Sequence, residues 1–155
     1  MAGQSIIREA TPRDLDALLE LELAGFDRDA FRLGQLRYLL NRANATTFIL
    51  EEDGKALGAA IMLWRKNSSV GRLYSIVVDP AFQGRGLGSK LLKACEDAAL
   101  RRGCASLSLE VRADNQRAIL FYQRHGYRTT ESLPGYYADG ATGLRMVKEK
   151  VKITV

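Results

Sequence analysis

Glu110 and Tyr122 are the two residues whose types and positions best suit proton transfer. Alternating apolar and polar residues over 104–112 predict a strand that carries Glu110 on its polar face. Asn115 and Tyr122 are seven residues apart, about two turns of the helix expected there, so both face one groove. A carboxylate accepts a proton, and a phenol with an ordinary pKa near ~10 donates one. The alternatives are a solvated strand carboxylate and a core tyrosine with its hydroxyl at the surface.

A glycine-rich turn between a predicted strand and a predicted helix is the second feature. The stretch VVDPAFQGRGLGSKLLKACEDAAL, residues 77–100, places Gly84, Gly86 and Gly88 just before a helical apolar stripe. Such a turn presents unpaired backbone N–H groups at the positive end of a helix, and glycines let an anion approach them. The spacing matches neither GxGxxG, where Ser89 replaces the last glycine, nor GxxxxGK[ST]. The turn therefore predicts a phosphate site of neither the NAD nor the ATP type.

Two motifs resemble those of the GNAT superfamily of N-acetyltransferases. VDP at 78–80 and QGRGLG at 83–88 are similar to its acetyl-CoA loop. LEVRADNQRAILFYQRHGY, residues 109–127, resembles the strand and helix of its ribosomal-protein alanine and related protein N-terminal acetyltransferases. The resemblance covers residues 73–127 and extends to GYYADG at 135–140, whereas the first 45 residues match far less well. Taken alone, the glycine turn is also compatible with a tight strand-to-helix connection.

The resemblance implies an acetyl-CoA cleft between splayed central strands. In the family, the strand before the loop pairs its backbone with the pantetheine arm, and the loop amides hold the pyrophosphate. An asparagine at the following helix contacts the cofactor, and no metal is implied. The cofactor-binding residues implied here are Ile76, Val77, Val78, Gln83, Gly84, Arg85, Gly86, Leu87, Gly88, Ser89, Asn115 and Tyr122.

Acetyl transfer to an amine requires a deprotonated amine, a polarised thioester carbonyl and a proton for the departing thiolate. The resemblance makes Glu110 the catalytic base, directly or through water, and Tyr122 the acid beside the sulfur. Many family members carry a base on the strand before the loop, but RLYSIVV at 72–78 contains no carboxylate, which favours Glu110. Cys95 and Cys104 lie outside the residues expected to touch the thioester, so we expect direct transfer without an acyl-enzyme.

The acceptor is predicted to be the N-terminal α-amine of a protein or peptide, because the likeness is to enzymes of that kind. We expect Tyr136 and Tyr137 to contact it, with packing aromatics as the alternative. FDRDAFRLGQLRYLL at 26–40 lacks the Pro-Glu-Asn-Tyr type of signature found in several N-terminal acetyltransferases. The second hypothesis is therefore a small amine acceptor, such as a polyamine, an amino acid or an antibiotic. The third, a CoA-binding regulatory module without activity, does not require Glu110 and Tyr122.

The elements that must position these residues are typical of a mixed α/β fold. A helix opens at Thr11-Pro12 with leucines at 15, 18, 19 and 23 as its apolar stripe, and Asp53-Gly54 predicts a hairpin turn. The resemblance implies one GNAT domain, residues 1–155, with a mostly antiparallel sheet of six to seven strands and about four helices. Strands are expected at 5–8, 46–51, 56–64, 72–78, 104–112, 127–133 and 144–152, and further helices at 30–41, from the glycine turn to 103, and from 115 to about 125.

Composition limits the remaining classes of protein. The 155 residues are 46% hydrophobic, and no apolar run approaches the ~18 residues of a membrane-spanning helix. MAGQSIIREA lacks the pattern of a secretory signal, so we expect a cytoplasmic protein, a monomer or a homodimer, without membrane partners. The net charge of +5 suits an anionic ligand, but no basic run interleaves with aromatics, so no nucleic acid partner is expected. The cysteine spacing predicts no metal site, and His125 is expected at the surface.

Overall fold

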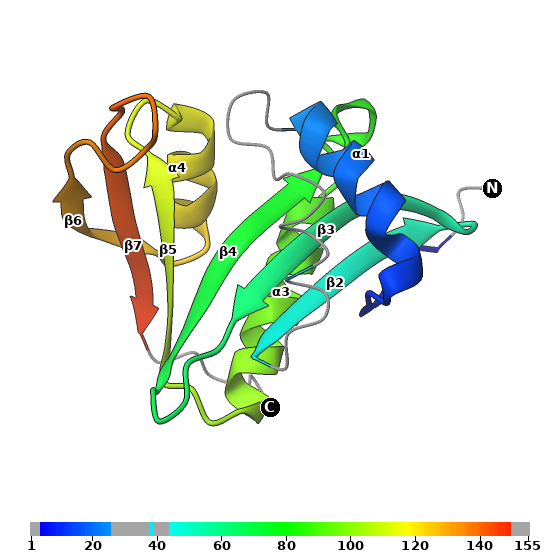
Figure 1. The fold of residues 1–155 in the computed structure, drawn as a ribbon, viewed down its shortest axis with the longest axis horizontal. Helices are drawn as coiled ribbons and strands as arrows, with labels where there is room; N and C mark the ends of the chain where they lie inside the picture. The colour runs from blue at the N-terminus through cyan, green and yellow to red at the C-terminus, as the bar shows by residue number, and fades with distance from the viewer. Residues whose placement is uncertain (1–3, 26–37, 39–43, 150–155) are drawn as a thin grey trace.

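The computed structural model describes residues 4–25, 38 and 44–149. Its strands are β1 (Ile6–Glu9), β2 (Ala45–Glu52), β3 (Lys55–Leu63), β4 (Val70–Val78), β5 (Ser106–Arg112), β6 (Arg128–Leu133) and β7 (Gly143–Glu149). They form one seven-stranded sheet in the order β1-β2-β3-β4-β5-β7-β6 (Figure 1). Only β4 and β5 are parallel neighbours, and the other neighbouring pairs are antiparallel. The expected mixed, mostly antiparallel sheet is confirmed.

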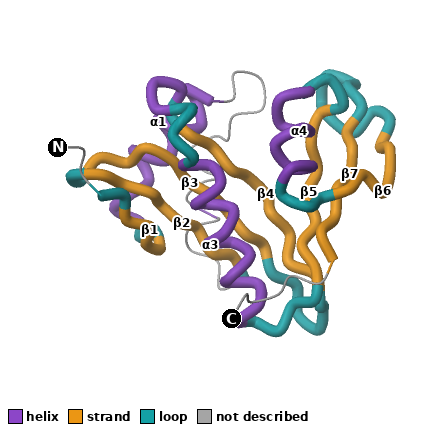
Figure 2. Tube along the Cα trace, turned by 180° about the vertical axis from the view of Figure 1, so that it is seen from behind, coloured by secondary structure: helices purple, strands orange, loops and turns teal. Residues whose placement is uncertain are grey.

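Helices lie on both faces of this sheet. They are α1 (Leu15–Gly25), α3 (Leu87–Arg101) and α4 (Gln116–Arg124), with 3-10 turns η1 (Pro12–Asp14) and η2 (Pro80–Phe82). α1 crosses one face, and α3 lies on the opposite face, as the two views show (Figure 1 and Figure 2). The helix predicted over 30–41 lies outside the described residues, apart from Tyr38. Within the described part of the chain, no helix is long and apolar enough to cross a membrane.

Helix caps set the start of two strands later than the sequence predicted. Gly103 and Gly126 adopt positive φ angles of 80° and 92° after α3 and α4. The next amides, of Cys104 and Tyr127, then donate back to carbonyls of the preceding helix, at 2.9 and 3.0 Å. This is the Schellman pattern, and it removes both amides from strand pairing. β5 therefore begins at Ser106 and β6 at Arg128.

α1 begins as expected, and three of its four predicted stripe leucines, Leu15, Leu18 and Leu19, pack against the core. The Thr11 amide donates to Asp14 Oδ2 at 2.8 Å, which satisfies one unpaired donor at the helix start. The prediction that Leu23 belongs to the buried stripe is wrong, because this side chain is 57% exposed. Positions 21, 22 and 25 also face the sheet, with Glu22 buried and Gly25 packed directly on Val77. A Cβ at Gly25 would collide with the Val77 side chain, so the glycine permits this close approach.

A β-bulge in β4 changes which side chains face α1. Ile61 of β3 pairs with Ser75 and the next residue, Met62, pairs with Leu73, so Tyr74 is the extra residue. Leu73 therefore packs in the core on the α3 side, whereas Val77 packs under α1. Without the bulge, these two residues would share one face, because a strand has a period of two.

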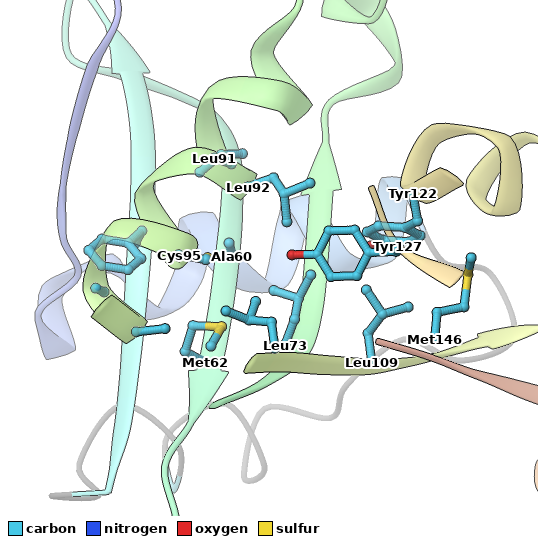
Figure 3. Packing of buried hydrophobic residues seen from close by; sticks show 14 of the residues in the cluster. Ala60, Met62, Leu73, Leu91, Leu92, Cys95, Leu109, Tyr122, Tyr127 and Met146 are labelled. Atoms are coloured by element: carbon cyan, nitrogen blue, oxygen red, sulfur yellow. The ribbon is translucent and has the colours of Figure 1, made fainter. Parts of the chain in front are cut away.

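The core is divided between the two faces of the sheet. The larger cluster lies between the sheet, α3 and α4, and it includes Leu92, Leu109, Tyr122, Tyr127 and Met146 (Figure 3). The smaller one lies under α1, where Leu18 and Leu21 meet residues of β2, β3 and β4. α4 therefore contributes Tyr122 to the core at the same place where it borders the site described next.

Candidate active site

β4 and β5 pair over only four positions and then separate. The pairs run from Val70↔Ser106 to Leu73↔Leu109, and the bulge at Tyr74 follows immediately. A cleft of about 800 Å³ opens beyond this point. Figure 1 shows the two strands diverging toward α4 and the C-terminal end of α1. The predicted site residues that line the cleft are Ile76, Val77, Val78, Gln83, Gly84, Gly86, Leu87, Gly88, Ser89, Glu110, Asn115, Tyr122 and Tyr137.

The glycine turn forms one end of this cleft. Gly84 and Gly86 have φ angles of 84° and 75°, and a Cβ on either would meet no atom within 4 Å. Gly86 is the N-cap of α3 and offers no side chain to cap the first amides of the helix. Arg117 and Arg124 of α4 line the same cleft and add positive charge. Free amides, positive φ at glycines and nearby guanidiniums fit the pyrophosphate of coenzyme A.

Arg85 was predicted to bind the cofactor through its backbone amide, and its side chain points to another partner outside the residues that line the cleft. Its guanidinium pairs with Glu52 of β2, including a 3.1 Å contact from Nη1 to Oε2. Arg85 therefore ties the glycine turn to the hairpin, which leaves its backbone amide as the group available to a phosphate. The Leu87 side chain, by contrast, is buried in the core.

α4 holds Asn115 and Tyr122 on the cleft, as the seven-residue spacing predicted. Asn115 Oδ1 accepts from the Ala118 amide at 3.1 Å, so the residue caps the helix. Tyr122 is only 7% exposed and makes edge contacts with the rings of Phe121 and Tyr127. Burial raises the pKa of the Tyr122 phenol above its ordinary value. The phenol therefore stays protonated at neutral pH, as a proton donor must.

Glu110 is held at the edge of the cleft by two arginines. Its Oε2 accepts from Arg72 Nε at 3.2 Å, and its Oε1 accepts from Arg145 Nη2 at 3.4 Å. The side chain of Glu110 is 9% exposed. A second hollow of about 860 Å³ lies beside the cleft, and Tyr74 and Glu110 line both of them. The carboxylate thus stands where two separate approaches meet.

A model of the acetyltransferase (GNAT) family matches residues 13–127. The chain belongs to the GNAT family. An uncharacterized N-acetyltransferase of Methanocaldococcus jannaschii is 33% identical over 150 residues, which is 94% of this chain and 92% of that protein. The crystal structure of the ribosomal-protein-S18-alanine N-acetyltransferase from Escherichia coli superimposes with a TM-score of 0.86 at 27% identity and covers 97% of both chains.

A third comparison extends the likeness of fold. PaiA N-acetyltransferase from Thermoplasma acidophilum, solved in complex with coenzyme A, gives a TM-score of 0.81 at 16% identity, covering 94% of this chain and 99% of that chain. At this identity, the match shows the fold alone. The family membership and the acetyltransferase relatives identify the chain as an acetyl-CoA-dependent N-acetyltransferase.

The β6–β7 loop of this GNAT domain carries the predicted tyrosine pair over the sheet. Tyr136 is 42% exposed, and its hydroxyl accepts from Arg72 Nη2 at 3.0 Å. The Arg112 guanidinium lies 4.5 Å from the centroid of the Tyr137 ring and also pairs with Asp139 at 3.0 Å. Only Tyr137 of the pair lines the cleft. Arginines of β4 and β5 therefore fix the loop beside Glu110.

Several residues on the cleft were missed by the sequence reasoning. Arg117 and Arg124 are seven residues apart on α4, so helical spacing contained a signal for them. Glu22 and Ser75 also line the cleft, but they meet only through the packing of α1 on β4. Nothing in the pattern LELEL distinguishes Glu22 from its exposed neighbour Glu20.

His125 was predicted to lie at the surface, but it is half-buried. Its Nδ1 donates to the Phe121 carbonyl at 2.7 Å, because a carbonyl only accepts. In the neutral ring, Nε2 then accepts from Ser89 Oγ at 2.9 Å. The end of α4 is thereby tied to the first turn of α3. Burial also raises the pKa of the Cys95 and Cys104 thiols, which makes neither a ready nucleophile.

Gly86→Val is expected to weaken coenzyme A binding about 10-fold or more, measured by calorimetry, because a β-branched residue resists the left-handed conformation by ~1–2 kcal/mol. Gly103→Val is the matched control, since Gly103 follows the other end of α3 with a φ of 80° and an equally open Cβ position. This control should bind coenzyme A as the wild type does. Wild-type affinity in the Gly86 variant would contradict the role of the glycine turn.

Proposed function

We propose that this enzyme acetylates the N-terminal α-amine of a protein or peptide by direct transfer from acetyl-CoA. The observation that carries the proposal is the meeting of two hollows at Tyr74 and Glu110. One contains the glycine turn and suits acetyl-CoA, and the other is open to an acceptor that arrives from the opposite side. Two approaches to one carboxylate suit a ternary complex in which donor and acceptor are bound together.

The acceptor class is supported by the loop and by the relatives. Tyr137 lines the acetyl-CoA cleft, and the Tyr136 hydroxyl bonds Arg72, which lines the second hollow, so the pair would contact a peptide that reaches Glu110. The Escherichia coli structure with 27% identity over almost the whole chain is that of the ribosomal-protein-S18-alanine N-acetyltransferase, an enzyme named for a protein acceptor. A peptide N-terminus is therefore preferred over a small free amine.

The residues of the cleft would serve two purposes, cofactor binding and proton transfer. The backbone of Ile76–Val78 would pair with the pantetheine arm, because no strand in the described part of the chain occupies this edge of β4. The amides of residues 84–89 would hold the pyrophosphate, and Asn115 would contact the cofactor beside them. Acetyl-CoA supplies the acetyl group as an activated thioester. The strand and the turn together would place this thioester near Tyr122.

Two side chains would then move protons during the transfer. Glu110 takes a proton from the attacking nitrogen, directly or through water, while its two arginines hold its orientation. The new N–C bond forms as the C–S bond breaks. Tyr122 gives its proton to the departing sulfur, which its raised pKa permits because the phenol is still protonated when the sulfur leaves.

Tyr122→Phe is expected to lower kcat by about 10²- to 10⁴-fold while the affinity for acetyl-CoA stays nearly unchanged, because only the proton donor is removed. Tyr127→Phe is the matched control: Tyr127 is equally buried, but its hydroxyl donates to Glu96 at 2.7 Å and it does not line the cleft. Steady-state kinetics of both variants give the comparison. Unchanged turnover in the Tyr122 variant would remove this residue as the acid.

The acceptor is tested by incubating the enzyme with acetyl-CoA and a library of peptides that differ in their first residues. Mass spectrometry then locates the acetyl group. We expect acetylation at free α-amines, with a preference among first residues. The same peptides with formylated N-termini should remain unmodified. Acetylation confined to lysine side chains would contradict the proposed acceptor. Acetylation of spermidine alone, in a parallel reaction, would also contradict it and would favour a small-amine enzyme.

A further inference from the structure

Glu22 is a buried carboxylate on the cleft that the mechanism above does not use. It is 3% exposed, and its Oε1 accepts from Ser75 Oγ at 2.9 Å. Its Oε2 is buried and has no hydrogen-bond partner among the described residues. A buried carboxylate oxygen without a donor is unfavourable, so this oxygen is suited to a donor that comes from outside the protein.

The position of Glu22 places that oxygen near the reaction. Gly25 brings the C-terminal end of α1 against Val77, and the bulge turns Ser75 toward α1. Ser75 follows Tyr74, the β4 residue at which the acetyl-CoA cleft meets the second hollow. Glu22 therefore borders the cleft from α1, whereas Glu110 borders it from β5.

Two protons leave the acceptor nitrogen in this reaction, and Glu110 accounts for only one of them. An α-amine arrives at neutral pH mostly as an ammonium group with three protons, and the amide product retains one. Glu110 takes the proton that leaves during attack, the thiolate receives its proton from Tyr122, and solvent afterwards carries a proton from Glu110 back to Tyr122. The first ammonium proton must leave before attack, because a nitrogen without a lone pair cannot form the N–C bond.

We propose that Glu22 binds the acceptor's ammonium group through Oε2 and takes its first proton before the attack. The proton passes from nitrogen to the carboxylate, the amine gains its lone pair, and the carboxylic acid later releases the proton to solvent. Ser75 is the positioning residue, since its hydroxyl fixes Oε1 and leaves Oε2 for the acceptor. This assignment rests on the transfer to an amine proposed above.

The environment of Glu22 suits an α-amine better than a lysine. Burial raises the pKa of Glu22 to about 7, although the hydrogen bond from Ser75 opposes the shift. An α-ammonium with an ordinary pKa of ~8 therefore gives up its proton to Glu22 across a difference of about one unit. A lysine ammonium with a pKa near ~10.4 faces more than three units. The same carboxylate thus selects N-termini over lysine side chains.

Burial and Ser75 are the two causes of this shift, and charged groups on other elements complete the surroundings. On α1 itself, Asp16 and Glu20 are exposed, and the β3 residues packed under the helix, such as Ala59 and Ile61, are apolar. The titratable or charged residues that line the cleft from elsewhere are Tyr74, Glu110, Arg112, Arg117, Tyr122, Arg124 and Tyr137.

Glu22→Gln tests the proposal, with Glu20→Gln as the matched control on the exposed side of the same helix. Kinetics are measured with the fastest peptide of the library, or with spermidine if that is the amine the wild type acetylates. The Glu22 variant should lose about 10²-fold in kcat/KM for the amine at pH 7, with the KM for acetyl-CoA unchanged. The control should retain wild-type values. Equal kinetics in both variants would overturn the proposal.

The pH profile distinguishes a proton acceptor from a merely structural carboxylate. With an α-amine, wild-type kcat/KM should fall below pH 7, as Glu22 is protonated, and again above pH 8, as the ammonium form disappears. The Glu22→Gln profile should instead rise through pH 8 without a fall, because only free amine reacts. Ser75→Ala should move the acidic limb to higher pH, since the hydrogen bond that lowers the Glu22 pKa is lost. Identical profiles for wild type and both variants would contradict the assignment.

Urea unfolding at two pH values tests whether the Glu22→Gln variant is folded. The raised pKa means that the folded state holds its proton more tightly than the unfolded state, so wild-type stability falls as pH rises from 4.5 to 7. Glu22→Gln should therefore resist urea better than the wild type at pH 8 and about equally at pH 4.5. If the acceptor is a small amine, the proposed function is wrong. The kinetic comparison of Glu22→Gln with Glu20→Gln can still be made with spermidine as the acceptor.

Discussion

The separation of β4 and β5 after four paired residues is the constraint on which the site depends. The outer neighbours of these strands continue: β3 pairs with β4 to Val78, and β7 pairs with β5 to Arg112. Among the residues that the structure describes, the facing edges of β4 and β5 have no strand partner beyond Leu73 and Leu109, so their backbone groups point into the cleft. Buried N–H and C=O groups require hydrogen bonds, and an extended ligand with amides of its own can supply them. The pantetheine arm of coenzyme A is such a ligand.

The bulge at Tyr74 determines which side chains border the cleft. It turns Ser75 toward α1, and it places Tyr74 at the junction of the two hollows. Glycines then bring the surrounding elements close: Gly25 seats α1 on β4, and a Cβ at Gly88 would lie 3.4 Å from the Phe121 ring of α4. Two carboxylates consequently border one cleft in different surroundings. Glu110 lies between guanidiniums, whereas Glu22 is buried with a single hydroxyl donor, and such differences assign separate roles to like groups.

The sequence predicted the parts of the site that are local. The glycine turn, the Asn115 cap and the spacing to Tyr122 each depend on residues that are close along the chain, and the structure contains all of them. The burial of Glu22 and the exposure of Leu23 were not predictable, because they depend on how the end of α1 packs on β4, a contact between residues far apart in the sequence. The pairing of the Arg85 side chain with Glu52 was not predictable either, because the two residues are 33 positions apart. The starts of β5 and β6 were predicted too early, because the amides of Cys104 and Tyr127 bond to the preceding helices.

Hydrogen–deuterium exchange of the wild-type enzyme with and without coenzyme A tests most directly whether the parted strands form the cofactor cleft. The account predicts slower amide exchange at residues 76–78 and 84–89 when coenzyme A is added, because those amides gain hydrogen bonds. Exchange in β7, whose pairing with β5 is complete, should not change. Protection elsewhere, with residues 76–78 and 84–89 unaffected, would contradict the account.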